Sequence, residues 1–459
     1  MEVTKAIAES KDFIELFKEL EIEIQKVRNA QKPTTVKKTK EADRRYFDWK
    51  PFMKWLKDNN FPNIDNFEIT FNPLSGHGLT AKKDFKAGEL ILEVPTKFMM
   101  TNKTAVQSKI ALLFHNDQIL QSVYSLALAL HLLMEKKTLN SFWGPYIDSL
   151  PRKVPNSPLF WKIDEVLKLR GTHALEELAK LKVSFVKAYC HVYFRLEKQL
   201  ENAIMKRAQF TYDSFGWAYS VTYSRQNQIY VEGSNKKLVP AFALIPVFDL
   251  MNHENGGHIT TNYIYEKDLL ETTAKRDFKK GEEIKIFYGE RPNVEFLINS
   301  GFAIPNNPFN YTAIFFSLLE SDKLKPKKTE ILQKCELPPS GKFALSIENP
   351  VQDELLSFLR IAWINKEEEL VAAEPIFNTQ PVSTQNELKV YTMLELKINQ
   401  ILSNFPTKLE DDKKQIEIAK QSGATHDYLI NQILIDEKTI LNNALTIIKN
   451  KKQLLQQNK

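Results

Sequence analysis

The spacing of apolar positions changes several times along the chain, and each change predicts a different kind of element. Residues 4–29 carry apolar side chains three and four positions apart among charged ones, which predicts an amphipathic helix. The aromatic-rich segment 46–61 predicts a second, short helix. From 67 to 100 the pattern becomes short runs of Ile, Phe, Thr and Val broken by glycine and proline, which predicts strands joined by tight turns. Helical spacing returns over 105–225.

Strand-like runs resume after this helical stretch. They are QNQIYVEG, ALIPVFDL, HITTNYIY, DLLETTA and EIKIFYG, all within residues 226–289. Beyond Pro308 apolar residues are again spaced as in helices, most regularly over 425–457. The order helical, β, helical, β, helical predicts an α+β fold. One β unit is interrupted by a helical insertion and followed by an all-helical C-terminal domain.

Composition and charge limit the class of protein. With 459 residues, 43% hydrophobic and 26% charged, the chain has the make-up of a folded globular protein of two or three domains. The net charge of +6 is spread along the chain apart from a basic cluster at Lys37, Lys38 and Lys40, so we expect no nucleic-acid partner. Cys190 and Cys335 are the only cysteines and form no Cys-x-x-Cys pair, which argues against a zinc site and fits a reducing compartment.

The sequence shows no targeting or membrane signal. Residues 1–20 mix acids and lysines with apolar residues and lack the uninterrupted apolar core of a signal peptide. The longest apolar stretch, Leu126–Met134, is shorter than the roughly 18 residues that cross a bilayer. We expect a monomer in the cytoplasm, with the nucleus as the other compartment, and no membrane partner.

Several common reaction centres are missing. The chain has no Gly-x-x-x-x-Gly-Lys phosphate loop and no Gly-x-Ser-x-Gly nucleophile motif, and Gly76-His-Gly78 lacks the third glycine of a dinucleotide fingerprint. Asp249, His253 and His258 match no established spacing of metal ligands, so we expect no metal.

Three other segments carry the candidate chemistry. DLMNHENG (249–256) follows the apolar run ALIPVF, FYGERPNVEFLINSGF (287–302) lies further along, and GHGLTAKKDFKAGELILEVP (76–95) lies upstream. In this order they resemble the motifs of the SET domain, in which one C-terminal segment threads through a loop formed by the other beside the cofactor. The resemblance implies a protein methyltransferase that uses S-adenosylmethionine.

The helical insertion and the helical C-terminal part resemble the Rubisco large-subunit methyltransferases, a SET subclass that acts on non-histone proteins. SRQNQI (224–229), IPVFDLMNH (245–253) and WGPYIDSLP (143–151) are most similar to its actin-histidine N-methyltransferase branch. The expected division is an N-terminal helical segment (1–65), the first SET part (66–104), the helical insertion (105–225), the second SET part (226–306) and a helical substrate-binding domain (307–459).

The resemblance also implies a set of cofactor-binding residues. Asn252 and His253 would hold the amino-acid end and the adenine of S-adenosylmethionine, and Arg225 would pair with its carboxylate through a planar guanidinium suited to two-pronged contacts. The branch typically has an acidic and an aromatic residue where Ser75 and His77 stand, so this chain departs from it there. Arg45 matches a further arginine of the family near the cofactor. The full set of expected cofactor-binding residues is Arg45, Ser75, Gly76, His77, Arg225, Asp249, Leu250, Met251, Asn252, His253, Tyr288, Ser300, Gly301 and Phe302.

Three residues are expected at the methyl acceptor. Tyr288 matches the tyrosine that borders the methyl-transfer channel. Asn227 matches a side-chain amide that hydrogen-bonds the non-reacting nitrogen of a histidine ring. Phe248 stands where the lysine-specific relatives have a small residue and the histidine branch has Trp. A phenyl ring there shortens the pocket but supplies no indole N–H.

A histidine acceptor also needs less activation than a lysine. Lysine, with a pKa of about 10.4, loses a proton at a cost of about 4.6 kcal/mol at pH 7, whereas histidine, at about 6.5, is already mostly neutral. The expected activity is transfer of a methyl group to the tele nitrogen of a histidine in actin. A lysine methyltransferase acting on a non-histone protein and a non-catalytic SET-fold binding module remain the alternatives.

Overall fold

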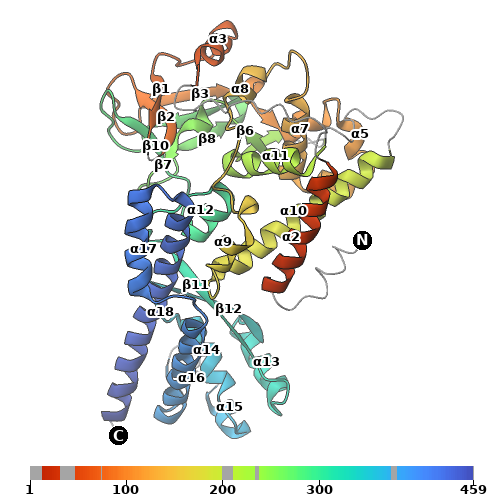
Figure 1. The fold of residues 1–459 in the computed structure, drawn as a ribbon. Coiled ribbons are helices and arrows are strands. Elements are labelled where there is room, and N and C mark those ends of the chain that lie inside the picture. Colours follow the sequence, from red (N-terminus) through yellow and green to blue (C-terminus); the bar gives the residue numbers. More distant parts are fainter. Residues whose placement is uncertain are drawn as a thin grey trace. The chain divides into compact units, whose positions relative to one another are not determined.

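The structure is a computed structural model, which describes residues 13–31, 47–73, 75–198, 210–232, 237–373 and 380–457. Figure 1 shows the helices and strands of the chain. Contacts within the chain divide it into two compact units, called unit 1 and unit 2. Unit 1 comprises 1–160, 180–290 and 298–301, and unit 2 comprises 161–179, 291–297 and 302–459. Arg45, one of the expected cofactor residues, lies outside the described residues.

Unit 1 contains the strands predicted on both sides of the helical stretch. β1 (Phe67–Asn72) and β2 (Gly76–Ala81) form an antiparallel pair, and β10 (Glu283–Ile286) pairs with β2. β7 (Asn252–His253) completes this four-stranded sheet as a parallel neighbour of β10. Strands from opposite sides of the helical insertion therefore share one sheet, which confirms the predicted α+β fold with a split β unit.

Two further sheets belong to unit 1. One has the order β3-β9-β8 and the other the order β4-β6-β5. The first again joins a strand from before the insertion to strands from after it. The six strands are β3 (Leu90–Pro95), β4 (Met100–Thr101), β5 (Asn227–Glu232), β6 (Leu238–Leu244), β8 (Thr261–Ile264) and β9 (Leu269–Thr273).

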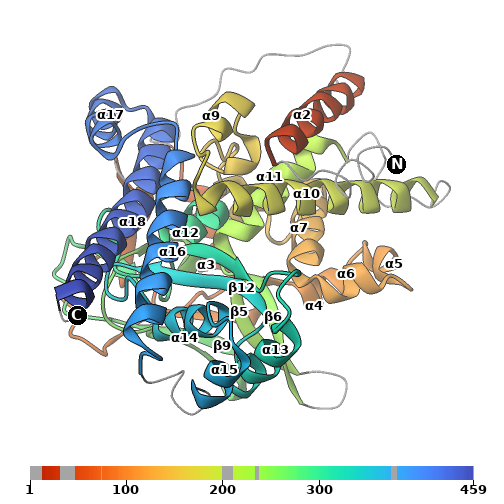
Figure 2. The same cartoon turned by 90° about the horizontal axis from the view of Figure 1, so that it is seen from below.

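The helical insertion packs around one apolar helix, α7 (Tyr124–Glu135). Every residue from Ser125 to Met134 is buried, which explains why α7 lacks a polar face. It packs against α11 (Tyr212–Arg225), whose first turn is capped by reciprocal bonds between Thr211 and Ser214 (Figure 2). The other helices with residues in unit 1, of which α10 begins in unit 2, are α2 (Phe13–Ala30), α3 (Lys50–Asp58), α4 (Asn102–Val106), α5 (Ala111–Phe114), α6 (Gln118–Ser122), α8 (Gly144–Ser149) and α10 (His173–Lys198).

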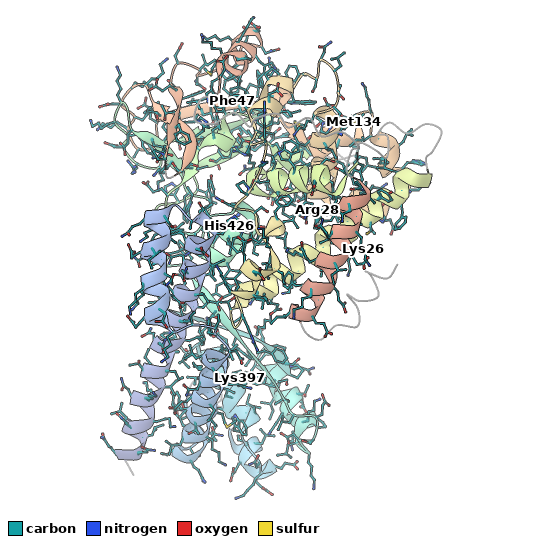
Figure 3. The ribbon with its side chains drawn as sticks, viewed as in Figure 1. Lys26, Arg28, Phe47, Met134, Lys397 and His426 are labelled. Carbon is teal, nitrogen blue, oxygen red and sulfur yellow. The ribbon has the colours of Figure 1, made fainter. Side chains whose placement is uncertain are left out.

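The predicted N-terminal amphipathic helix is confirmed over its described part, α2. Its inner face buries Leu16, Leu20 and Ile24 in the core of unit 1. Arg28 adds a polar anchor, because its Nε donates to Asp213 of α11 at 2.8 Å (Figure 3). No helix in the part of the chain that the structure describes combines the length and apolar character needed to cross a membrane.

Unit 2 is mostly helical, but it also contains one strand pair. β11 (Tyr311–Ser317) and β12 (Ser340–Ser346) are antiparallel, with Tyr311 opposite Ser346. This corrects the all-helical expectation for 307–459. The segment YTAIFFS alternates buried and exposed positions and is rich in aromatic and β-branched residues, which favours a strand. The helices with residues in unit 2, besides the start of α10, are α9 (Ile163–Leu167), α12 (Asn293–Ser300), α13 (Lys325–Lys334), α14 (Asp353–Ala362), α15 (Glu367–Ala373), α16 (Thr384–Ser403), α17 (Leu409–Ser422) and α18 (Thr425–Gln457).

Two adjacent acids of α18 bind backbone and side-chain donors inside unit 2. Glu437 is buried and accepts the backbone N–H groups of His173, at 2.9 Å, and Ala174, at 3.3 Å, where α10 begins. Asp436 accepts a hydrogen bond from Asn293 Nδ2 at 2.7 Å. Burial raises the pKa of Glu437 to about 7 and that of Asp436 to about 6, since removal from water disfavours the charged carboxylate.

Candidate active site

The two C-terminal motifs meet along a parallel strand pair. Asn252 and His253 form β7, in which Asn252 lies opposite Lys285 and His253 opposite Ile286 of β10. The N–H of Glu254 extends this pairing by donating to the Ile286 carbonyl at 3.0 Å. DLMNH and FYG therefore lie side by side in unit 1, as the resemblance to the SET domain implied.

The imidazole of His253 uses both ring nitrogens and joins the two motifs through one of them, Nδ1. Nδ1 accepts the backbone N–H of Tyr288 at 3.1 Å, so it carries no proton in this geometry. Nε2 lies 2.9 Å from Asn255 Oδ1 and is therefore the protonated nitrogen. The Tyr288 hydroxyl donates to the Met251 carbonyl at 2.7 Å, which gives the motifs a second link.

A buried polar triad holds the predicted cofactor arginine. Arg225, the last residue of α11, donates from Nη1 to the Asp249 carbonyl at 2.8 Å and lies 3.4 Å from the Asp249 carboxylate. Tyr146 on α8 donates its hydroxyl to the same carboxylate at 2.7 Å. A guanidinium has five N–H donors, so these contacts orient Arg225 while leaving donors for a ligand carboxylate.

Burial and charge act in opposite directions on this triad. Burial raises the pKa of Asp249, although Arg225 and Tyr146 act to lower it. Burial alone would lower the pKa of Arg225, but the Asp249 carboxylate raises it. The pKa of Tyr146 is raised, first by burial and then by the charge of Asp249. The guanidinium is therefore a fixed positive charge, and Tyr146 is a hydrogen-bond donor.

The two residues expected to choose the acceptor come from different elements. Asn227 begins β5, opposite Ala243 of β6, and donates its Nδ2 to the Arg225 carbonyl at 3.0 Å. Phe248 begins a 3₁₀ turn (Phe248–Leu250) and is 3% exposed, so its ring is part of the protein interior. The residue before it, Val247, has φ +71° and ψ −52°, and a positive φ is rare for a β-branched residue.

The predicted strand ALIPVF thus ends earlier than its apolar run. β6 stops at Leu244, and the chain turns through Val247 into the 3₁₀ turn that carries Phe248 and Asp249. Such backbone strain costs about 1–3 kcal/mol and is often found at functional sites. Here it directs the start of the DLMNH motif.

Asn252 is held by a carboxylate that the sequence did not single out. Its Nδ2 donates to Glu283 Oε1 at 2.7 Å and to the His77 carbonyl at 3.4 Å. Ser75 Oγ also donates to Glu283 Oε1, at 3.2 Å. The turn and strand around Gly76, which has φ +80°, therefore lie against Asn252, as expected for two sides of one site.

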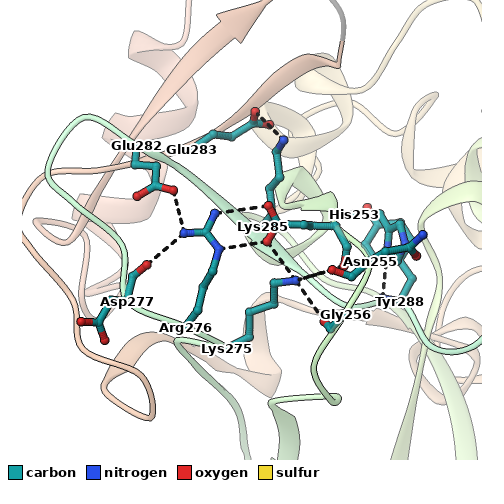
Figure 4. Close-up of polar contacts among 11 residues, drawn as sticks. His253, Asn255, Gly256, Lys275, Arg276, Asp277, Glu282, Glu283, Lys285 and Tyr288 are labelled. Atoms are coloured by element: carbon teal, nitrogen blue, oxygen red, sulfur yellow. Dashed lines mark hydrogen bonds and ion pairs between the residues drawn. The ribbon is translucent and has the colours of Figure 1, made fainter. Parts of the chain in front are cut away.

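A buried lysine fixes the loop that follows His253. Lys275 Nζ donates to the carbonyls of Glu254 at 3.1 Å, Asn255 at 3.2 Å and Gly256 at 3.1 Å, and its side chain is 4% exposed (Figure 4). It also pairs with the Glu254 carboxylate at 2.9 Å. Burial would raise the pKa of Glu254, but hydrogen bonds from Arg276 and Lys275 lower it to about 2. This arrangement, the Lys275 clamp, places Asn255 beside His253.

The predicted adenine segment is divided between the units. Ser300 and Gly301 belong to unit 1, and Gly301 has φ +71° with Asn156 atoms 3.0 Å from where a Cβ would lie, so only glycine fits without rearrangement. Phe302 belongs to unit 2 and stacks on Phe296 with ring centroids 4.8 Å apart. Within the described residues no cluster of three or more His, Cys, Asp or Glu side chains is arranged to hold a metal.

Four contacting residues were missed from the sequence: Tyr146, Asn255, Lys275 and Glu283. Tyr146 and Asn255 lie inside stretches that carried the resemblance, WGPYIDSLP and DLMNHENG, so their motifs were the available signal. Lys275 and Glu283 lie among many charged residues with no local pattern to mark them. Only the strand pairing places them beside DLMNH.

Comparisons with known proteins agree with this arrangement. Residues 76–289 match the SET domain family model, and residues 319–441 match the Rubisco LSMT substrate-binding model. An actin-histidine N-methyltransferase from Gallus gallus is 37% identical over 92% of this chain and 71% of its own length. The proteins of the same name from Xenopus tropicalis and Homo sapiens are each 36% identical, over 95% and 92% of this chain and 75% and 71% of their own lengths.

Solved structures share the fold at lower identity. The SET domain of LSMT bound to lysine and AdoHcy superimposes with a TM-score of 0.71 at 20% identity, covering 88% of this chain and 92% of that one. Rubisco LSMT bound to sinefungin and monomethyllysine gives 0.72 at 21% identity over the same shares. The chain belongs to the SET-domain family and, within it, to the family of the actin-histidine N-methyltransferases.

Proposed function

We propose that this protein transfers a methyl group from S-adenosylmethionine to the tele nitrogen of a histidine in actin. The observation that carries the proposal is the 37% identity to an actin-histidine N-methyltransferase over 92% of the chain. The match of 319–441 to a substrate-binding model supports a protein substrate that this part of the chain recognises.

The side chains of the site fit the cofactor. S-adenosylmethionine, when bound, supplies an electrophilic methyl group on a positively charged sulfur. Arg225, oriented by Asp249 and Tyr146, is suited to the ligand's carboxylate. The backbone of Asp249–His253, together with Ser75–His77 and the segment from Ser300, is suited to its amino-acid end and adenine. Tyr288 of FYG is hydrogen-bonded to His253 and Met251 of DLMNH, and its ring can border the path of the methyl group.

The local geometry of Asn227 supports a histidine acceptor. Its Nδ2 already donates to the Arg225 carbonyl, so the other arm of the amide, Oδ1, is the acceptor it can offer a substrate. An imidazole whose non-reacting nitrogen donates N–H to Oδ1 presents the lone pair of its other nitrogen for attack. The buried ring of Phe248 supports a short, flat pocket.

Mass spectrometry of actin tests the proposal. Actin that lacks histidine methylation is incubated with the protein and S-adenosylmethionine carrying a deuterated methyl group, and the labelled residue is mapped. We expect label on one histidine in the wild type and at least a tenfold lower rate in Arg225→Leu. Label on lysine alone would support the lysine methyltransferase alternative. Absence of both labelling and cofactor binding would support the non-catalytic binding module.

A further inference from the structure

Glu283 of β10 has an unusual environment for an acidic side chain in a sheet. Its carboxylate accepts hydrogen bonds from Asn252 Nδ2 at 2.7 Å, Ser75 Oγ at 3.2 Å and Asn72 Nδ2 at 3.4 Å. Lys285 Nζ forms a longer ion pair with the Glu283 carboxylate at 3.6 Å, beyond hydrogen-bond distance (Figure 4). With the side chain 16% exposed, one negative charge is thus held mainly by neutral donors.

Gly78 explains how this carboxylate reaches Asn252. β10 pairs with β2, where Glu283 lies opposite Thr80, so the Glu283 side chain extends along β2 toward the turn. A Cβ on residue 78 would lie 2.8 Å from Glu283 Oε1 and 3.0 Å from Asn252 Nδ2. The second glycine of Gly76-His-Gly78 therefore leaves room for a contact between two side chains.

The same contact determines the orientation of the Asn252 amide. Its nitrogen faces two acceptors, Glu283 Oε1 and the His77 carbonyl, and the reversed amide would place an oxygen against both. The Asn252 oxygen is consequently on the arm directed away from Glu283. The Glu283 carboxylate and the His77 carbonyl meet in this corner, and an alkylammonium group, with three N–H donors, requires acceptors of this kind.

We propose that Glu283 is a cofactor-binding residue whose carboxylate provides the counter-charge for the α-ammonium group of S-adenosylmethionine. This inference rests on the proposed function. The amino-acid end of the cofactor would then meet two opposite charges. Arg225 would bind its carboxylate, and Glu283 would bind its α-ammonium group. The proposal also explains how this chain can have Ser75 where the branch typically has an acidic residue. The Glu283 carboxylate of β10, 3.2 Å from the Ser75 hydroxyl, would take the place of that acid.

Calorimetric titration with two ligands tests this assignment. S-adenosylhomocysteine carries the α-ammonium group, whereas 5′-methylthioadenosine keeps the adenosine and the sulfur but lacks the amino-acid end. Glu283→Gln preserves the shape and an acceptor for Asn252 while removing the charge. We expect it to weaken S-adenosylhomocysteine binding at least tenfold and to change methylthioadenosine binding less than twofold. Glu271→Gln, which removes a carboxylate of β9 paired with Lys267, is the matched control and should change neither affinity.

The outcomes separate this inference from the proposed function. If the wild type binds neither ligand, the proposed use of the cofactor is wrong. If the wild type binds both, and Glu283→Gln weakens both equally or neither, Glu283 does not recognise the ammonium group. Should Glu283→Gln fail to fold, Glu283→Asp replaces it: the shorter carboxylate should weaken S-adenosylhomocysteine binding selectively, and an equal effect on both ligands would contradict the assignment.

Discussion

At the scale of single residues, Asn227 is the side chain on which the choice of acceptor depends. Replacing it with Leu removes the amide that would hold the substrate imidazole. Loss of one such hydrogen bond costs about 1–3 kcal/mol, so we expect kcat/KM for histidine methylation to fall about 5- to 150-fold. Cofactor affinity should stay within twofold, because the contact of Asn227 with Arg225 is to a backbone carbonyl. Unchanged turnover in a steady-state assay would refute the ring hydrogen bond.

Tyr146 acts one step further from the ligand, through Asp249 and Arg225. Tyr146→Phe leaves the buried Asp249 carboxylate without its 2.7 Å hydrogen bond, and Arg225 at 3.4 Å cannot replace it. We expect a loss of about 1–3 kcal/mol in the free energy of unfolding, measured in urea, and weaker cofactor binding. Tyr124→Phe, whose half-buried ring packs near Phe242, is the control. Equal stability of the two variants would exclude a supporting role for the Tyr146 hydroxyl.

At the scale of elements, the Lys275 clamp binds three carbonyls of the loop after β7, and we expect it to fix the conformation of this loop. Lys275→Met removes the donor that the half-buried carbonyls of Glu254 and Asn255 share with the exposed carbonyl of Gly256, so we expect about 1–3 kcal/mol of destabilisation. Faster amide exchange at 253–257 and at Tyr288 should accompany it, since Asn255 and His253 lose their fixed geometry. Lys279→Met, the control, removes an exposed ion pair with Asp84 and should leave the free energy of unfolding almost unchanged, because solvent screens such pairs. Similar exchange in both variants would show that the loop does not need the clamp.

Elements whose apolar pattern has a clear period were predictable from the sequence, and contacts across strands were not. β10 and the long helix α18 follow directly from their patterns. β11 was missed because YTAIFFS lies in a region dominated by helical spacing, and the early end of β6 was missed because Ile245, Pro246 and Val247 continue an apolar run. These three residues are buried because the chain turns there, and an apolar run does not show where a strand gives way to a turn.

The same limit applies to the site. DLMNH and FYG are local motifs, so their adjacency follows from the resemblance. Glu283 reaches Asn252 only because β10 pairs with β2 on one side and with β7 on the other. The sequence around Glu283 does not show which distant strands β10 pairs with. A charged residue in a charged segment is also ordinarily exposed to solvent, so nothing marked Glu283 as a site residue.

At the scale of the whole molecule, each unit contains a carboxyl group whose pKa is strongly shifted, and the two shifts have opposite directions. In unit 1 the pKa of Glu254 is lowered to about 2 from 4.5, so its contribution is present at neutral pH and is lost as the pH falls through the acid range. In unit 2 the pKa of Glu437 is raised to about 7, so the folded form binds a proton that the unfolded form releases near 4.5. That contribution is present below 4.5 and is lost as the pH rises toward 7.

Glu437→Gln isolates the second effect, because the amide cannot ionise. The difference between the pKa of about 7 in the folded protein and the usual 4.5 of a glutamate corresponds to about 3 kcal/mol, which the wild-type unit 2 loses between pH 4.5 and pH 7. We expect the transition of unit 2 in scanning calorimetry to shift down by several degrees between pH 5 and pH 8 in the wild type, and by much less in Glu437→Gln. The variant should also be less stable at pH 5, since one amide oxygen replaces two carboxyl oxygens that accept from His173, Ala174 and Thr312. If the pH shift is unchanged in Glu437→Gln, another group titrates. The neighbouring Asp436 carboxyl, which is buried and accepts hydrogen bonds from three side-chain amides, would then be tested by Asp436→Asn.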